Sequence, residues 1–280
     1  MCSIEPTRRE AIRLATFGTV GLLAVSGCGQ SFDSVQTGPA AGVRPAVPAS
    51  PSLPGTSDDM IEMMPGLQIH RRAAWGADLL PKSSLERETV RFLLVHHTAS
   101  SNNYDDPRTV IRSAYGFHTS ASKGWGDVAY HFFVARDGSV WEGRSGSLEG
   151  PVVADATGGN QGWAQLVCLI GNHVDQPPTA AAQASLVNVL KWLAWRYRLD
   201  ADAGATATYV SRGSNKLASG TTVTTPIISG HRDATLTACP GDAAYDLLPT
   251  WRNLVSAMPD PAFPQSGPYP PAARLGVIEP

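Results

Sequence analysis

Three continuous apolar runs dominate the hydrophobic pattern of the chain. They cover residues 90–97, 128–135 and 165–170. Because polar positions do not alternate within them, the runs predict strands that are covered on both faces, as in α/β proteins. The turn Arg136-Asp137-Gly138 follows the second run and predicts a tight hairpin with a return strand at 139–142.

Three other segments have the spacing of helices that are apolar on one face. Residues 107–120 follow this spacing with a proline in the first turn, and residues 179–197 carry the longest apolar stripe. Residues 243–258 predict a final helix, whereas residues 201–225, rich in Ala, Gly, Ser and Thr, predict a long loop. The order of elements predicts one α/β domain at 67–258, with a mixed central β-sheet flanked by helices.

Residues 1–28 have the pattern of an export signal. Arg8-Arg9 precedes a largely apolar segment at 14–27, which is too short to span a bilayer stably as a helix. The paired arginines are typical of twin-arginine export, and Val25-Ser26-Gly27-Cys28 resembles a bacterial lipobox, in which the cysteine is lipidated. We expect an exported lipoprotein of the cell envelope, anchored to the membrane through Cys28. The alternatives are a Sec-type signal cleaved nearby and a cytoplasmic chain with a chance apolar start.

Proline-rich segments flank the predicted domain. Residues 29–66 contain no hydrophobic period and intersperse prolines with Gly, Ala, Ser and Asp, which predicts a disordered tether. Residues 259–280 are again rich in proline and predict a loose tail. A tether behind a lipid anchor would let the domain reach away from the membrane.

Charge and cysteine content exclude two classes of protein. The net charge of -2 provides no basic surface for nucleic acid. The four cysteines do not form a disulfide scaffold, because Cys2 and Cys28 lie in the leader, Cys168 in an apolar run and only Cys239 in a polar loop. We therefore expect no disulfide in the mature chain, no nucleic-acid partner and a monomeric protein.

The strongest candidate chemistry lies in residues 228–241, where His231 is followed eight residues later by Cys239. Gly and Pro punctuate this segment, which therefore predicts a loop. Nitrogen and sulfur donors suit Zn²⁺, and the strand at 90–97 ends in His96-His97, either of which could be a third ligand. Three protein ligands with one open position are typical of a catalytic zinc. The alternative is a surface histidine and a small core cysteine.

Five motifs occur in order along residues 70–256, and together they resemble one family. They are Arg72-Ala73-Ala74-Trp75-Gly76-Ala77, Val95-His96-His97-Thr98-Ala99, Gly124-Trp125-Gly126-Asp127-Val128-Ala129-Tyr130-His131-Phe132, Asp137-Gly138-Ser139-Val140-Trp141-Glu142-Gly143-Arg144, and Gly230-His231-Arg232-Asp233 through Cys239-Pro240-Gly241. These segments are similar to the zinc-dependent N-acetylmuramoyl-L-alanine amidases, the family that includes the peptidoglycan recognition proteins.

The resemblance implies roles for individual residues. It makes His96, His231 and Cys239 the ligands of one Zn²⁺ and Tyr130 the catalytic tyrosine. Thr237 falls where relatives have a supporting Lys or Thr. His97 and His118 are expected to contact substrate. Two departures stand out. Cys168 occupies a position where some relatives have a glutamate, and many relatives have a histidine shortly before a Gly-Gly-x-Asn turn, where this chain has Asp155-Ala156-Thr157-Gly158-Gly159-Asn160.

The same resemblance implies a substrate type. In the recognition-protein branch, a Gly-Trp pair with an Arg nineteen residues after the Trp accompanies stem peptides with meso-diaminopimelate at position three, and Gly124, Trp125 and Arg144 have this spacing. A guanidinium can hold the additional carboxylate of diaminopimelate with two hydrogen bonds. The alternative is that Gly124-Trp125 is a turn with a core aromatic and that Arg144 pairs only with Glu142 or solvent.

We therefore expect an exported zinc amidohydrolase with a single catalytic domain. Its expected reaction is hydrolysis of the amide bond between N-acetylmuramic acid and L-alanine in peptidoglycan. The main alternative is a non-catalytic peptidoglycan-binding lipoprotein on the same fold. A cytoplasmic metal-binding protein is disfavoured by the leader and the tether.

Overall fold

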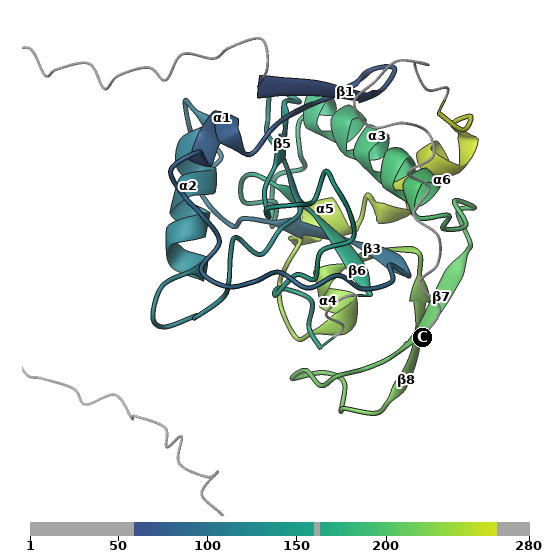
Figure 1. The fold of residues 1–280 in the computed structure, drawn as a ribbon. Coiled ribbons are helices and arrows are strands. Elements are labelled where there is room, and N and C mark those ends of the chain that lie inside the picture. Colours follow the sequence, from purple (N-terminus) through teal and green to yellow (C-terminus); the bar gives the residue numbers. More distant parts are fainter. Residues whose placement is uncertain (1–58, 160–162, 262–280) are drawn as a thin grey trace, which may run out of the picture. The chain divides into compact units, whose positions relative to one another are not determined.

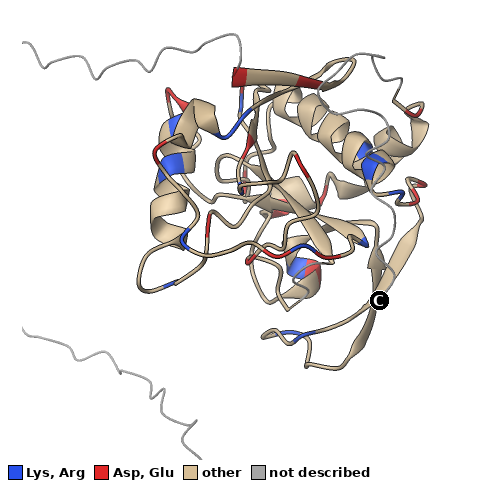
Figure 2. Ribbon diagram, viewed as in Figure 1, with Lys and Arg blue, Asp and Glu red and all other residues tan. Residues whose placement is uncertain are grey.

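The computed structural model describes residues 59–159 and 163–261. The predicted export signal, Cys28 and most of the predicted tether lie outside the described residues, as does most of the predicted tail. None of the described helices is both long enough and apolar enough to cross a membrane. Figure 2 shows acidic and basic residues interspersed over the described elements, in keeping with the small net charge of -2.

A mixed sheet forms the centre of the described part of the chain (Figure 1). Its strand order is β1-β2-β5-β4-β6-β3-β9. β6 runs parallel to β3 and β4, β3 also runs parallel to β9, and the β4–β5 and β1–β2 pairs are antiparallel. The strands are β1 (Met60–Met64), β2 (Leu67–His70), β3 (Phe92–His97), β4 (Phe132–Val134), β5 (Val140–Glu142), β6 (Ala164–Leu169) and β9 (Ile228–Gly230). The predicted α/β class with a mixed central sheet is confirmed.

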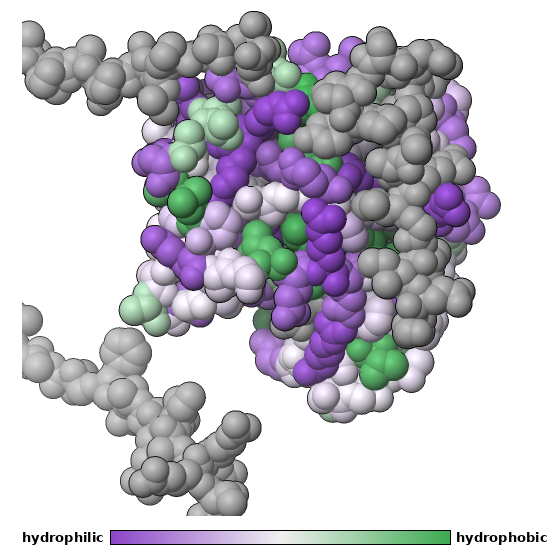
Figure 3. All heavy atoms as spheres, viewed as in Figure 1, coloured by the Kyte–Doolittle hydropathy of each residue, from purple (hydrophilic) through white to green (hydrophobic). Residues whose placement is uncertain are grey.

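Both faces of the central strands are covered, as their continuous apolar runs predict. Every residue of β3 and β6 is buried. Val167 and Leu169 pack in a core cluster with helix α3 (Ala180–Arg196), whereas Cys168 packs in a second cluster with helix α2 (Pro107–His118). Successive strand residues point to opposite faces, so one run supplies both cores. In the face that Figure 3 displays, apolar residues lie in small patches among hydrophilic ones.

The two longest helices, α2 and α3, begin where side chains can replace missing backbone partners. Thr179 Oγ1 accepts a hydrogen bond from the Ala182 N–H at the start of α3, and Asp106 caps α2 by accepting from the Arg108 N–H. Such caps satisfy N–H groups that the first turn leaves free. The short helix α1 (Ala73–Gly76) lies beside α2 (Figure 1), and its Trp75 is fully buried in the second cluster.

Four sequence predictions differ from the structure in their boundaries or type, one of them the strand predicted at 128–135, of which only β4 (Phe132–Val134) forms. The folded domain does not begin at residue 67, because β1 (Met60–Met64) precedes it and pairs with β2. Ile61 and Met63 alternate with exposed residues, so a short period-2 signal was present in the predicted tether. The turn between β1 and β2 uses Gly66, which has φ +82°.

The segment 201–225 is not simply a loop, because it contains an antiparallel hairpin of β7 (Thr206–Val210) and β8 (Thr222–Pro226). Only Tyr209 is fully buried in β7, where its ring stacks on Phe92 with centroids 4.9 Å apart. A strand that buries one residue carries almost no hydrophobic pattern. Its abundant threonines nevertheless favour extended backbone, because branching at Cβ restricts the side chain.

The predicted helix at 243–258 is two helices, α5 (Asp242–Tyr245) and α6 (Leu248–Ala257). Pro249 lies in the first turn of α6. A proline has no N–H to donate and clashes with the preceding turn, so it starts a new helix instead of continuing one. α6 packs beside α3 on the sheet, with Trp251 fully buried between them.

Candidate metal centre

His96 and His231 meet because β3 and β9 are parallel neighbours. Val95 lies opposite Gly230 in the register, so the next residue of each chain segment emerges at the same edge of the sheet. His231 is the first residue of helix α4 (His231–Ala234), directly after β9. The two imidazole centroids are 4.3 Å apart, and His96 is completely buried.

Cys239 completes the cluster from the segment 231–239, which we call the metal loop. Its Sγ lies 3.6 Å from His96 Nδ1 and accepts a hydrogen bond of 3.3 Å from the His97 N–H. One ligand atom from each of His96, His231 and Cys239 lies within 4.8 Å of the others. Within residues 59–159 and 163–261, this is the group of His, Cys, Asp and Glu that could hold a metal ion.

The donors of this cluster fit a zinc ion. Two nitrogens and one sulfur within a few ångströms form a donor set that Zn²⁺ prefers, with a fourth position left for water or substrate. The Nε2 atom of His96 is buried without a hydrogen-bond partner in the described structure. A buried polar atom without a partner is costly unless a ligand satisfies it. The predicted ligand set is therefore brought together by the fold.

Burial sets the protonation of the three groups. It lowers the pKa of His231 to about 4 and the pKa of His96 well below its usual 6.5. Both imidazoles are thus neutral at pH 7 and keep a lone pair for a cation. Burial raises the pKa of the Cys239 thiol to about 12, so this thiol loses its proton only when a cation compensates the charge.

Tyr130 lies beside the cluster, just before β4. Its ring centroid is 5.1 Å from that of His96, and its edge packs against Phe133 at 5.5 Å. The Arg144 N–H donates to the Tyr130 carbonyl at 2.8 Å, which ties the tyrosine to the neighbouring chain segment after β5. Burial raises the pKa of Tyr130 well above 10, so the phenol stays protonated and can donate a hydrogen bond.

His97 and Thr237 occupy positions around the cluster but not in it. The His97 Nδ1 accepts from the His173 N–H at 3.2 Å, and the centroids of the two rings are 6.3 Å apart. Thr237 is exposed, and its Oγ1 accepts from the Cys239 N–H at 3.2 Å. Thr237 therefore stabilises the turn that precedes Cys239.

The predicted substrate contacts extend outward from Tyr130. The His118 ring lies 5.4 Å from the Tyr130 ring and 5.0 Å from the Trp125 ring. His118 Nδ1 accepts from the Ala129 N–H at 3.1 Å. Gly124 has φ +64° and no heavy atom within 4 Å of the place a Cβ would occupy, so this side of the row is open. His118, Tyr130 and partly buried Trp125 thus form a continuous row beside the metal centre.

Arg144 has a partner that sequence reasoning missed. Arg144 is 5% exposed, and its guanidinium donates to Asp155 Oδ2 at 2.6 Å and to the Val128 carbonyl at 3.1 Å. Glu142, the partner considered from sequence, instead accepts from the backbone N–H groups of Arg72 and Leu148. Arg144 Nε has no partner in the described structure. The guanidinium is therefore only partly satisfied by the protein.

A second buried ion pair was also not predicted from the sequence, although both of its residues lie in the family motifs. Asp127 is completely buried and pairs with Arg72 at 2.9 Å. The other oxygen of Asp127 accepts from the Ser145 N–H at 2.9 Å. Arg72 also stacks over the Trp75 ring at 4.6 Å. Asp127 therefore fastens the segment that carries Trp125 to the segment that carries Arg144.

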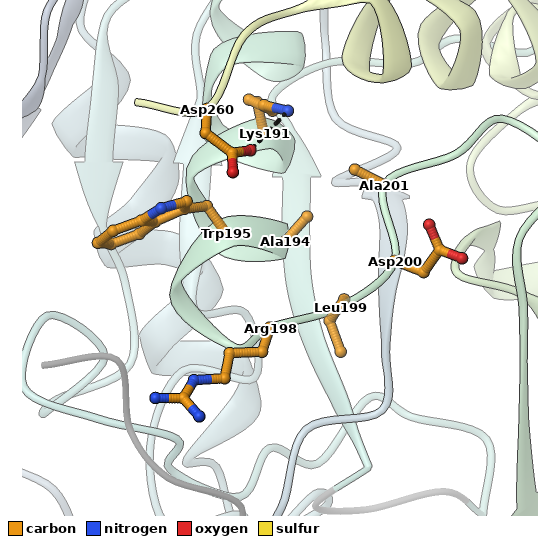
Figure 4. Close-up of a pocket in the computed structure, with 8 residues that line it drawn as sticks. All are labelled: Lys191, Ala194, Trp195, Arg198, Leu199, Asp200, Ala201 and Asp260. Atoms are coloured by element: carbon orange, nitrogen blue, oxygen red, sulfur yellow. Dashed lines mark ion pairs between the residues drawn. The ribbon is translucent and has the colours of Figure 1, made fainter. Parts of the chain in front are cut away.

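A separate surface pocket of about 440 Å³ lies at the end of α3 (Figure 4). Its charged side chains include Lys191, which is 5% exposed and pairs with Asp260 at 3.2 Å. None of its lining residues belongs to the metal cluster or to the row beside it. The candidate chemistry therefore lies at the carboxyl ends of β3 and β9.

Comparison with known proteins agrees with this geometry. The family model described as N-acetylmuramoyl-L-alanine amidase matches residues 86–242. The chain is 31% identical to the human N-acetylmuramoyl-L-alanine amidase over 201 residues, which are 69% of this chain and 30% of the human protein. It is also 31% identical to mouse peptidoglycan recognition protein 1 over 187 residues, which are 65% of this chain and 86% of the mouse protein.

Solved structures show the same fold. Drosophila peptidoglycan recognition protein SD aligns with a TM-score of 0.50 at 21% identity, covering 70% of this chain and 97% of that one. Drosophila PGRP-LB aligns with a TM-score of 0.50 at 22% identity, covering 65% and 93%. The chain thus spans about a third of the human relative but most of the recognition-protein domains. It belongs to the N-acetylmuramoyl-L-alanine amidase family.

Proposed function

We propose that this protein is a zinc-dependent amidase that hydrolyses the bond between the lactyl group of N-acetylmuramic acid and the first L-alanine of the stem peptide. The observation that carries the proposal is the convergence of His96, His231 and Cys239 at one end of the sheet, with Tyr130 alongside. Family membership supports an amide of peptidoglycan as the substrate.

The reaction needs a polarised carbonyl and an activated water, because an amide is a weak electrophile. Zinc held by the three ligands would supply Lewis acidity toward both. The protonated phenol of Tyr130 is suited to donate to the oxygen on which charge develops, and removing one such donor typically costs about 10²–10³ in turnover. Cys168 is buried among core residues and its pKa is raised by burial, so it does not replace the glutamate of some relatives as a base.

His118 is suited to bind substrate as a neutral donor. Burial lowers its pKa to about 4, so it is uncharged at pH 7. Because Nδ1 accepts from the Ala129 N–H, the proton of the neutral ring resides on Nε2. Nε2–H can therefore donate to a carbonyl of the stem peptide that lies along the row with Trp125. We retain Thr237 in a supporting role, through the turn that precedes Cys239.

We further propose that the stem peptide carries diaminopimelate at position three. Support comes from Gly124, Trp125 and Arg144, and from the unpartnered Nε of Arg144. The side-chain carboxylate of the substrate would compete with Asp155 for this guanidinium. A charge-assisted hydrogen bond contributes about 1.5–3 kcal/mol, so competition with Asp155 reduces the discrimination that a free guanidinium would give.

The second candidate function is peptidoglycan binding without hydrolysis, because relatives of this family are named as recognition proteins. Retention of all three candidate ligands and of Tyr130 favours the enzyme. We also propose export and a lipid anchor at Cys28, for which the support is the leader sequence alone.

The product of the reaction tests the proposal. Purified protein is incubated with a defined diaminopimelate muropeptide, and the products are separated and weighed by mass spectrometry. The proposal predicts a stem peptide with a free L-alanine amino group and a muramic acid with a free lactyl carboxylate. Binding of the muropeptide without either product would favour the recognition function instead.

A further inference from the structure

The loop between β7 and β8 contacts the middle of the metal loop. We call residues 211–221 the hairpin tip. Figure 1 shows the β7–β8 hairpin extending from the sheet on the side of α4, the helix that begins the metal loop. Ser214 Oγ donates to the Ala234 carbonyl at 2.8 Å, and Lys216 Nζ donates to the Arg232 carbonyl at 2.6 Å. The tip therefore binds backbone groups between the two metal ligands of this loop.

Asn215 makes the densest of these contacts. Its Oδ1 accepts from the Leu236 N–H at 2.8 Å and from Thr235 Oγ1 at 2.7 Å. Its Nδ2 donates to the Leu236 carbonyl at 3.2 Å. One amide side chain thus satisfies both backbone groups of Leu236, much as a neighbouring strand would.

The hairpin tip is itself held in place. Ser214 Oγ accepts from the Lys216 and Leu217 N–H groups at 3.1 and 3.0 Å, which closes a compact turn. At its base, the guanidinium of Arg212 forms an ion pair with Glu88. Hydrogen bonds from the tip to the metal loop therefore connect that loop to a fixed part of the domain.

The metal loop needs such support because its centre is exposed. Leu236 is 66% exposed, and Thr237 and Ala238 are also exposed. The ends of the loop lie at the metal cluster, whereas the backbone of Leu236 in the middle is bound by Asn215. Ordering a free segment opposes binding by about 1–2 kcal/mol per residue, so a loop fixed in advance binds its ligand more tightly.

We propose that Asn215 is a positioning residue for the metal centre, which holds the metal loop in the conformation that brings Cys239 to His96 and His231. This inference rests on the proposed zinc site. Groups that orient metal ligands without touching the metal typically change affinity by about 10–100-fold when they are removed. The Asn215→Ala variant should therefore bind zinc about 10–100-fold more weakly than the wild type.

The test measures zinc affinity by competition with a chromophoric chelator, together with the melting temperature of the metal-free protein. Asn215→Ala removes all three contacts, whereas Asn215→Asp keeps the acceptor and loses only the donor to the Leu236 carbonyl. The aspartate variant should therefore fall between alanine and wild type. Asn188→Ala is the matched control, because Asn188 lies in α3 and donates one hydrogen bond, at 3.3 Å, to the Gly66 carbonyl between β1 and β2, outside both loops.

Zinc affinity of Asn215→Ala within twofold of the wild type would overturn the inference, even if the metal-free protein melts at a lower temperature. Such a result would give Asn215 a role in the stability of the hairpin only. Wild-type protein that binds zinc but hydrolyses no muropeptide would contradict the proposed function and leave the role of Asn215 standing. Wild-type protein that binds no zinc would contradict both.

Discussion

Replacing Asp155 by alanine removes the carboxylate that pairs with Arg144. The pair is mostly buried, since the side chains of Arg144 and Asp155 are 6% and 27% exposed and their charged atoms lie 2.6 Å apart. Because Asp155 is partly exposed and Arg144 keeps its hydrogen bond to the Val128 carbonyl, we expect the loss of this partner to cost about 1–3 kcal/mol, less than the loss of a fully buried pair. In a domain of this size, each 1 kcal/mol lowers the melting temperature by about 2–4 °C. We expect Asp155→Ala to be less stable but to fold.

Asp155→Ala should also increase the preference for diaminopimelate over lysine at position three of the stem peptide. A diaminopimelate carboxylate would no longer compete with Asp155, and an interaction of about 2 kcal/mol corresponds to roughly 30-fold in binding. The assay compares kcat/KM on two muropeptides that differ only in diaminopimelate or lysine at position three. We expect the ratio of the two values to be at least about tenfold higher for Asp155→Ala than for the wild type.

The double variant Arg144→Ala/Asp155→Ala is the control, because it removes the cation together with its partner. It should show no preference between the two muropeptides, as should Arg144→Ala alone. Equal ratios in the wild type and in Asp155→Ala would contradict competition between Asp155 and the substrate carboxylate for Arg144. They would show that Arg144 maintains the structure around Val128 and does not contact the third residue of the stem.

Three further substitutions test the roles of the Tyr130 phenol, the Arg72–Asp127 ion pair and the Cys28 anchor. Tyr130→Phe should lower turnover about 10²-fold or more while zinc content, measured by metal analysis, stays the same; wild-type rates would remove the phenol from the mechanism. Arg72→Met leaves the buried Asp127 carboxylate unpaired and should lower the free energy of unfolding by about 3–5 kcal/mol in denaturant titration, whereas a loss below about 1 kcal/mol would contradict this role. Cys28→Ala should release the protein from membranes or block its processing, and a mature protein that starts at another residue and is free outside the cell would exclude the lipid anchor.

The elements that sequence predicted well are those whose pattern is strong on its own. β3 and β6 are apolar on both faces, and α3 has a long stripe that includes Leu186 and Leu190. The β7–β8 hairpin was not predicted from the sequence, because Tyr209 is the only buried residue of β7. The break between α5 and α6 could have been read from Pro249, which cannot continue a helix from the preceding turn.

The residues of the candidate metal centre could be predicted from the sequence, but the hydrogen bonds and ion pairs around them could not. The strand carrying His96-His97 is buried on both faces, so alternation could not identify which histidine faces Cys239. The structure brings His96 into the cluster and turns His97 toward His173. The pairing of Asp155 with Arg144 and the contacts of Asn215 were not predicted, because the fold alone brings these partners together and an isolated Asp or Asn carries no pattern.

We propose that zinc held by His96, His231 and Cys239 is required for hydrolysis. The most direct test strips the protein with a chelator, verifies metal loss by elemental analysis, and measures hydrolysis of a diaminopimelate muropeptide before and after zinc is returned. Activity should disappear with the metal and return when one zinc per chain is bound, but should not return in Cys239→Ser under the same conditions. Full activity in protein shown to contain no metal would contradict this role of zinc.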